Sequence, residues 1–193
     1  MRPVRNVIGG LGNLMFKQAF LYAQAREGVI PDVYVQSERY WEKYKDEVRA
    51  MYSEGIGYID MVSLQVRRGD YVNNSFYVDL SSTDYYQKAI EHFPNEKFLI
   101  FCHDNQDPEI DRQDKEWVLE FLNSFMAGRY VLNTPGSETD DLNKMASCKG
   151  HIMANGTFAW WGSYLGHGKT VCPKNWFTDG VQRCELLNEW TLI

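Results

Sequence analysis

One stretch of the chain alternates between apolar and polar residues with a period of two, which is the pattern of a β-strand with one buried face. The apolar positions of this stretch are Val62, Leu64 and Val66. Gln65 and Arg67 occupy the intervening register, so their side chains share the opposite face. The sequence therefore predicts a strand whose polar row ends in an arginine pair at the carboxyl end.

Shorter apolar runs follow this strand, separated by segments with helical periodicity. The predicted strands are Phe98–Cys102, Tyr130–Leu132, His151–Ala154 and Thr170–Cys172. The predicted helices begin at Thr83 or Asp84, at Glu109, at Thr139 as an N-cap, and after Asn155-Gly156-Thr157. Strands that alternate with helices predict an α/β fold with a parallel sheet covered by helices on both faces.

The chain before this alternating region has a weaker pattern of the same kind. The predicted elements are a strand at Val4–Ile8, a glycine turn at Gly9–Asn13, a helix at Leu14–Arg26, a short strand at Asp32–Gln36 and a polar helix at Glu38–Met51. Residues 54–58 fit a linker to the arginine strand.

Three predicted strand ends should meet at one edge of the sheet: Arg67-Arg68, His103-Asp104 and Asn155-Gly156-Thr157. Ligands bind at the carboxyl ends of strands in open α/β sheets. An arginine grips a phosphate with two parallel hydrogen bonds, and a helix beginning at Thr157 offers free N–H groups and a positive dipole end. This combination predicts a pyrophosphate site that needs no metal.

Plainer interpretations of these features remain open at the level of sequence. The two arginines also fit a solvated turn in which one of them pairs with Asp70. The glycine turn at Gly9–Asn13 can face a phosphate, but it also fits an ordinary tight turn, because it lacks the lysine of a P-loop. For Trp160 and Trp161 we favour core packing over sugar stacking.

Composition narrows the class of protein. The chain has 193 residues, of which 44% are apolar, so it can bury a substantial core. Its net charge is −6, which argues against a nucleic-acid binder that works by neutralising phosphates. The four cysteines form no C-x-x-C pair and are expected to be buried free thiols, and the four histidines show no metal-ligand spacing.

No apolar run resembles a signal peptide or is long enough to span a bilayer. The expected location is therefore the cytoplasm.

Several motifs agree with one family. The stretches Gly9–Phe16, Val62–Tyr71 and His151–Gly162 (HIMANGTFAWWG) closely resemble the α-1,2-fucosyltransferases of glycosyltransferase family 11, and Pro173–Phe177 is similar as well. The resemblance covers residues 1–25 and nearly all of 62–193, in the family's order. It implies a GT-B-like fold, with a Rossmann-like GDP-fucose-binding domain at residues 62–193 and a reduced N-terminal α/β part on the acceptor side at residues 1–61.

The resemblance also implies an activity, namely transfer of L-fucose from GDP-L-fucose, with inversion and without a metal, to the 2-hydroxyl of a terminal galactose in a glycan. A glycolipid acceptor would bring the protein to the surface of a membrane. Arg67 would hold the β-phosphate, and Asp70 would brace the arginine turn or act as a general base. The remaining residues implied at the donor are Gly10, Gly12, Asn13, Gln65, Arg68, His103, Asp104, Asn155, Gly156, Thr157 and Phe158.

Departures from the family pattern leave other hypotheses open. Gln65 stands where the family usually has histidine, Leu14 replaces a glutamine, and Gly156 and Ala159 replace serines. The N-terminal part is also short. An inactive relative that only binds a guanine nucleotide or a glycan is one alternative, and a fucosyltransferase for a different acceptor hydroxyl is another.

The short N-terminal part carries the aromatic residues Tyr34, Tyr40, Trp41, Tyr44 and Tyr52. Aromatic side chains suit interfaces as well as cores. Either a homodimer that covers the cleft or a monomer in which these residues pack on the sheet is consistent with the sequence.

Overall fold

A six-stranded sheet forms the centre of the molecule in the computed structural model, which describes residues 10–27, 36–102 and 108–193. Its strands are β1 (Ile59–Gln65), β2 (Phe98–Phe101), β3 (Tyr130–Leu132), β4 (Cys148–Ile152), β5 (Lys169–Cys172) and β6 (Thr191–Leu192). All neighbouring strands are parallel, in the order β3-β2-β1-β4-β5-β6. This is the strand order of doubly wound, Rossmann-like sheets, which confirms the predicted α/β class.

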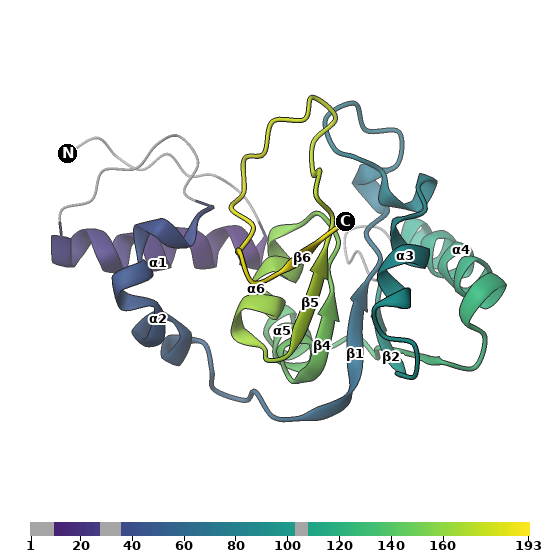
Figure 1. Cartoon of the computed structure of the whole chain (residues 1–193), viewed down its shortest axis with the longest axis horizontal. Coiled ribbons are helices and arrows are strands. Elements are labelled where there is room, and N and C mark those ends of the chain that lie inside the picture. The colour runs from purple at the N-terminus through teal and green to yellow at the C-terminus, as the bar shows by residue number, and fades with distance from the viewer. Residues whose placement is uncertain (1–9, 28–35, 103–107) are drawn as a thin grey trace.

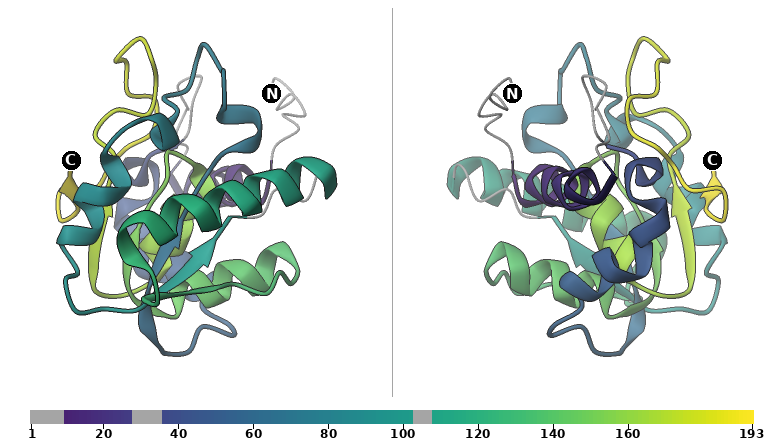
Figure 2. Two further views of the ribbon diagram at one scale, coloured as in Figure 1. Left: turned by 90° about the vertical axis from the view of Figure 1, so that its right-hand side faces the viewer. Right: turned by 90° about the vertical axis from the view of Figure 1, so that its left-hand side faces the viewer.

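Helices cover both faces of the sheet (Figure 1, Figure 2). The helices are α1 (Leu11–Glu27), α2 (Lys45–Met51), α3 (Tyr85–Glu91), α4 (Pro108–Met126), α5 (Glu138–Ala146) and α6 (Thr157–Leu165). Helices α3 and α4 pack against one face, and α1, α2, α5 and α6 contribute to the hydrophobic core on the other.

The predicted two-faced character of the arginine strand is confirmed. Val62, Leu64 and Val66 are buried in the core beneath α3 and α4. Ser63, on the other face, donates or accepts a hydrogen bond with Nδ1 of His151 at 2.8 Å. The strand ends in the 3-10 turn η3 (Gly69–Tyr71), where Gly69 has a φ of +50°, a conformation that glycine adopts without strain.

The described N-terminal residues join the same core as the sheet. Trp41 is 1% exposed and stacks on Trp161 of α6, with ring centroids 5.8 Å apart and an interplanar angle of 11°. Tyr52 also contacts Trp161, edge to face at 5.4 Å. Trp41 and Tyr52 therefore pack internally, as the monomer alternative expects. Tyr34 lies outside the described residues, and the oligomeric state and the division at residue 61 stay predictions.

Two sequence-based assignments are wrong in detail, and one short strand was not predicted. The expected helix at Glu38–Met51 is two 3-10 turns, η1 (Glu38–Tyr40) and η2 (Glu42–Tyr44), followed by α2, because the chain leaves helical geometry where Trp41 enters the core. The N-cap of α5 is Ser137 rather than Thr139, since Ser137 and Asp140 form a reciprocal capping box. Strand β6 was not predicted, because two residues are too few to show a period.

The strand expected at Val4–Ile8 and most of the one expected at Asp32–Gln36 lie outside the described residues. Among the residues that are described, no helix is both long enough and apolar enough to cross a membrane.

Candidate active site

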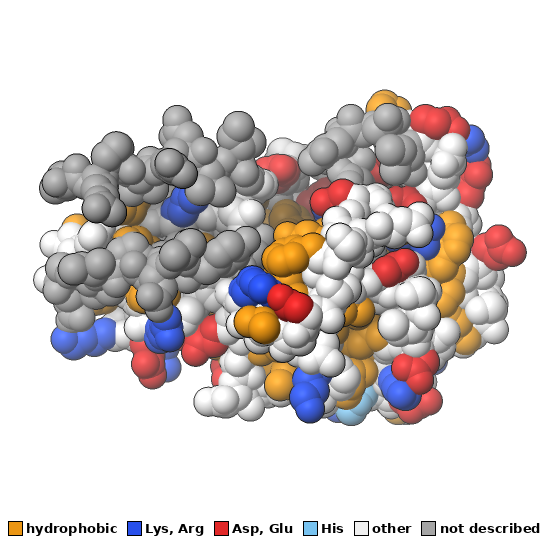
Figure 3. Space-filling model, turned by 90° about the horizontal axis from the view of Figure 1, so that it is seen from above, with side chains coloured by type: hydrophobic (Ala, Val, Ile, Leu, Met, Phe, Trp, Pro, Cys, Tyr) orange, Lys and Arg blue, Asp and Glu red, His pale blue; other side chains and the backbone are white. Residues whose placement is uncertain are grey.

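A pocket of about 540 Å³ opens at the carboxyl ends of the strands. Figure 3 looks onto this end of the molecule, where a hollow contains hydrophobic and acidic side chains. The lining residues are Gly10–Asn13 of the α1 start, Gln65–Arg67 of the β1 end, Asp70, Tyr71 and Tyr77 of the following segment, Gly156–Phe158 of the α6 start, and Phe101, Asn133, Glu138 and Asp141.

The pocket lies where the strand order reverses. Strand β1 is flanked by β2 on one side and β4 on the other, so the connections that leave β1 and β4 turn to opposite faces of the sheet. The diverging connections leave a crevice at the strand ends, where doubly wound sheets bind their ligands.

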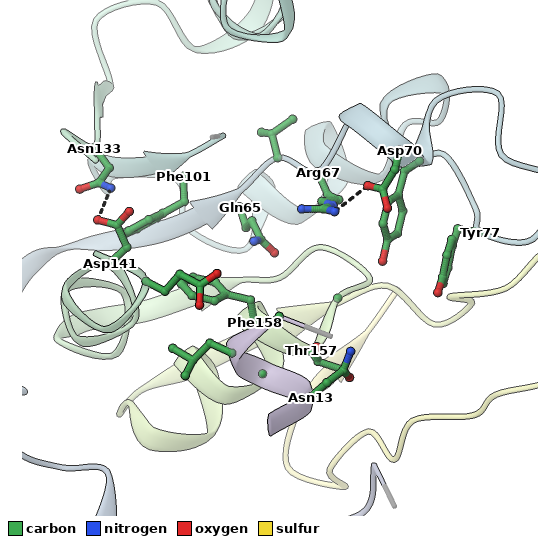
Figure 4. A pocket seen from close by; sticks show the side chains of 17 residues that line it. Asn13, Gln65, Arg67, Asp70, Tyr77, Phe101, Asn133, Asp141, Thr157 and Phe158 are labelled. Carbon is green, nitrogen blue, oxygen red and sulfur yellow. Dashed lines mark hydrogen bonds and ion pairs between the residues drawn. The ribbon is translucent and has the colours of Figure 1, made fainter. Parts of the chain in front are cut away.

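Arg67 is fixed at the β1 side of this crevice. Its Nη2 donates to Oδ1 of Asp70 at 2.6 Å, and its guanidinium carbon lies 5.0 Å from the ring centroid of Tyr71. Its backbone N–H donates to the Tyr86 hydroxyl at 3.4 Å. The side chain is 28% exposed, so the guanidinium is oriented and still reaches the pocket. Figure 4 shows Arg67 and Gln65 across the cavity from Phe158 and Thr157.

Helix α6 presents its amino end to the same cavity. Gly156 is its N-cap and has no side chain that could accept a hydrogen bond from the first turn. The backbone N–H groups of that turn can therefore bind a ligand. Tyr71 ties this turn to the arginine turn, because its hydroxyl donates to the carbonyl oxygen of Asn155 at 3.1 Å. The positive end of the helix dipole therefore lies on the same pocket as Arg67.

Helix α1 also begins at the pocket. Gly12 packs directly on the α6 start, since a Cβ at this position would lie 2.6 Å from the carbonyl carbon of Thr157 and 2.8 Å from the backbone nitrogen of Phe158. Asn13 accepts a hydrogen bond on Oδ1 from Nε2 of Gln36 at 2.8 Å. The glycine turn is thus more than a plain turn, because it brings two helix starts together at one cavity.

The opposite end of the pocket is acidic. Asp141 of α5 is 9% exposed, and its Oδ1 accepts from Nδ2 of Asn133 at 2.9 Å and from the backbone N–H of Gly136 at 3.1 Å. Lys144 lies 3.3 Å from the same oxygen. Glu138 from the first turn of α5 lines the cavity as well. Carboxylates here favour hydrogen-bond donors over phosphates.

Gln65 projects into the pocket between the two ends. Its Oε1 is buried and finds no hydrogen-bond partner among the residues that the structure describes. An unmet buried acceptor is unfavourable unless a ligand or water supplies a donor. The position where the family usually has histidine therefore borders the pocket, as its shared strand face with Arg67 predicts.

Two residues expected at the donor do not line the pocket. Arg68 turns away to α4, where its Nε donates to Oδ1 of Asp114 at 2.8 Å and its guanidinium carbon lies 3.8 Å from the Trp117 ring centroid. Asn155 is 1% exposed, and its Nδ2 donates to the carbonyl oxygens of Val78 and Trp176. Both residues hold neighbouring segments in place.

The expected residues His103 and Asp104 lie outside the described part of the chain. Other lining residues were not predicted from the sequence, namely Val66, Tyr71, Tyr77, Phe101, Asn133, Glu138 and Asp141. Asn133 directly follows a predicted strand, and ligands bind at the carboxyl ends of such strands, so the sequence could have identified it. Glu138 and Asp141 belong to the first turn of α5, which begins two residues earlier than expected. Tyr77 comes from an irregular loop without a periodic signal.

Comparisons with known proteins agree with this geometry. The family model described as glycosyl transferase family 11 matches residues 7–193. The chain is 28% identical over 166 residues to an alpha-1,2-colitosyltransferase of Escherichia coli, covering 74% of this chain and 54% of that protein. It is 30% identical over 139 residues to the O-antigen biosynthesis glycosyltransferase WbnK of Escherichia coli, covering 66% and 43%.

A mammalian relative is also similar. The galactoside alpha-(1,2)-fucosyltransferase 1 of Rattus norvegicus is 31% identical over 123 residues, covering 59% of this chain and 30% of that protein. The chain thus spans about half the length, or less, of the curated relatives it matches. No solved structure matches it significantly. Since the family model covers nearly the whole chain, this protein belongs to glycosyl transferase family 11.

Proposed function

We propose that this chain transfers L-fucose from GDP-L-fucose to the 2-hydroxyl of a terminal galactose in a glycan, with inversion and without a metal. The observation that carries the proposal is the meeting of Arg67 with the amino ends of α1 and α6 at one pocket. The names of two relatives support the linkage and the sugar class, since one specifies α-1,2 transfer of colitose and the other α-1,2 transfer of fucose to a galactoside.

The difficult step in such a transfer is departure of the nucleoside diphosphate. Negative charge builds on the β-phosphate as the bond to the sugar breaks. A guanidinium and two sets of oriented backbone N–H groups stabilise that charge without reorganising during the reaction. Asp70 and Tyr71 already contact the Arg67 guanidinium, so this group is oriented before the donor binds.

The acidic end of the pocket supports guanine as the base. Guanine presents two adjacent donors, N1–H and the exocyclic amino group, which a carboxylate accepts together. Adenine offers an unprotonated nitrogen at the corresponding position, which a carboxylate repels. Asp141 and Glu138 therefore favour a guanine nucleotide over an adenine nucleotide at this end.

Asp70 accepts a hydrogen bond from Arg67, which supports its role as a brace. Its further role as the base that takes the acceptor proton remains a prediction, and Asp70→Asn separates the two. Loss of GDP affinity indicates the brace. Loss of turnover with unchanged GDP affinity indicates the base.

Calorimetry and a transfer assay test the proposal. We expect GDP to bind at least about tenfold more tightly than ADP, and product to form from GDP-fucose and a galactoside in excess EDTA. Turnover that EDTA abolishes and magnesium restores would contradict the metal-free mechanism. Equal affinity for ADP would contradict the guanine assignment.

A second function fits one observation. Gln65 stands where the family usually has histidine, so this chain lacks an imidazole at that position beside Arg67. A chain that only binds a guanine nucleotide or glycan would show GDP affinity without product. Product with a glycosidic linkage to another hydroxyl would indicate a different acceptor position.

A further inference from the structure

Tyr77 forms the end wall of the pocket that is farthest from the acidic end (Figure 4). Its ring stacks on Tyr71 with centroids 4.4 Å apart and an interplanar angle of 19°. Tyr71 in turn contacts the Arg67 guanidinium. Arginine and two tyrosines therefore form one contiguous group, with Tyr77 at its outer end.

The position of Tyr77 is fixed by two loops that are distant in sequence. Tyr77 forms an isolated antiparallel bridge with Phe177, and the two rings lie 5.6 Å apart between centroids. The Asn155 amide holds the same loops together by donating to the carbonyl oxygens of Val78 and Trp176, at 2.8 and 3.1 Å. Asn155 comes just before α6, so the wall is built on the helix whose amino end faces the pocket.

The charges along the pocket orient a bound sugar nucleotide, and this step rests on the proposed function. The diphosphate belongs beside Arg67 and the α6 start, because Asp141 and Glu138 repel it from the other end. With the base at the acidic end, the sugar on the β-phosphate extends in the opposite direction. That direction leads past Arg67 toward Tyr77 (Figure 4), and Tyr71 contacts both of these residues.

We infer that Tyr77 contacts a pyranose at this end of the pocket and that its hydroxyl group forms a hydrogen bond with a sugar hydroxyl. The ring alone satisfies the packing against Tyr71, Phe76 and Phe177. The phenolic oxygen adds a group that both donates and accepts, which is what a pyranose hydroxyl requires. The pyranose is either the sugar of the donor or that of the acceptor.

Tyr77→Phe tests this inference, because it removes one oxygen and keeps the ring. The matched control is Tyr58→Phe, which removes the hydroxyl from a tyrosine that is 75% exposed outside the pocket lining. Calorimetry gives the Kd of GDP and of GDP-fucose, and kinetics gives the KM of a galactoside. Saturation-transfer NMR with methyl α-L-fucoside and methyl β-D-galactoside measures sugar binding without a nucleotide.

For Tyr77→Phe we expect a GDP Kd within about twofold of the parent value, and a rise of about five- to tenfold in one sugar-dependent constant. A rise in the Kd of GDP-fucose assigns the donor sugar, and a rise in KM for the galactoside assigns the acceptor. The inference is wrong if both constants stay within about twofold, or if GDP itself weakens as much as GDP-fucose.

The NMR measurement separates this inference from the proposed function. If the parent binds no GDP, the proposed function fails, and the glycosides still decide the role of Tyr77. Saturation of a glycoside that is present in the parent and Tyr58→Phe but lost in Tyr77→Phe supports the contact. Saturation that is absent in the parent, or unchanged in Tyr77→Phe, overturns it.

Discussion

Gly12 of α1 and Thr157 of α6 touch through their backbones, and no side chain fits between them. A Cβ on Gly12 would come within 2.6 to 2.8 Å of three backbone atoms of Thr157 and Phe158. Backbone atoms in a helix start cannot move aside easily. Position 12 requires glycine because the two helices approach each other closely there. The same contact sets the distance between the amino ends of α1 and α6 at the pocket.

Gly12→Ala should accordingly destabilise the protein. We expect a loss of about 1–3 kcal/mol in the free energy of unfolding, because overpacking outweighs the higher helix propensity of alanine. Chemical denaturation measures this loss. Gly10→Ala is the control, since a Cβ there meets no atom of the described residues within 4 Å, and its effect should stay within about 0.5 kcal/mol. Equal stability of both variants would show that α1 does not pack on α6 in this way.

Arg67→Lys should weaken nucleotide binding while the fold remains intact. Lysine keeps the positive charge but loses the planar fork that holds two oxygens. Weakening a desolvated charge pair typically costs about 2–5 kcal/mol, so we expect GDP affinity to fall by at least about tenfold in calorimetry. Arg112→Lys on α4, an exposed arginine paired with Glu109 and Glu116, should leave GDP binding unchanged. Parental GDP affinity in Arg67→Lys would remove Arg67 from the site.

The sheet was predictable because its strands are short, apolar and separated by helical periods. Three predicted strand ends also indicated the position of the pocket, and those at residues 67 and 155–157 lie beside it as expected. The period of two places Arg68 on the face opposite Arg67, as the structure has it, but the partner of Arg68 was not predictable. Asp114, its partner, lies 46 residues away, and no local pattern connects the two.

The Arg68–Asp114 pair positions the turn that carries Arg67. Asp114 accepts from Nε of Arg68 at 2.8 Å and from the backbone N–H of Gly69 at 2.7 Å, and the two side chains are only 15% and 13% exposed. Removing one partner of a buried pair leaves the other charge uncompensated. The pair therefore links the arginine turn to α4.

Asp114→Ala should lower the free energy of unfolding by about 3–5 kcal/mol and also weaken GDP binding, because the Gly69 turn loses its anchor. Denaturation and calorimetry measure the two effects. Asp84→Ala breaks an ion pair with Lys88 whose side chains are 68% and 60% exposed, and we expect less than about 1 kcal/mol from it. If Asp114→Ala bound GDP like the parent, the pair would stabilise the fold without positioning Arg67.

His151 gives the stability of the fold a defined dependence on pH. It lies in β4 beneath α6, is 1% exposed and contacts the Ser63 hydroxyl through Nδ1. Burial lowers the pKa of His151 to about 4. The ordinary pKa of histidine is about 6.5. Between about pH 4 and pH 6.5 the histidine therefore binds a proton in the unfolded chain but not in the folded chain.

Stability should therefore be constant with respect to His151 above about pH 6.5 and fall as the pH decreases toward about 4, by up to about 3 kcal/mol. Urea denaturation at pH 7.5 and pH 5 measures this fall. In His151→Asn, whose amide can still bond to Ser63, the fall should shrink even though the variant is less stable at pH 7.5. His92→Asn, at the end of α3 on the opposite face, should keep the parental slope. An unchanged slope in His151→Asn would show that other groups govern the acid sensitivity.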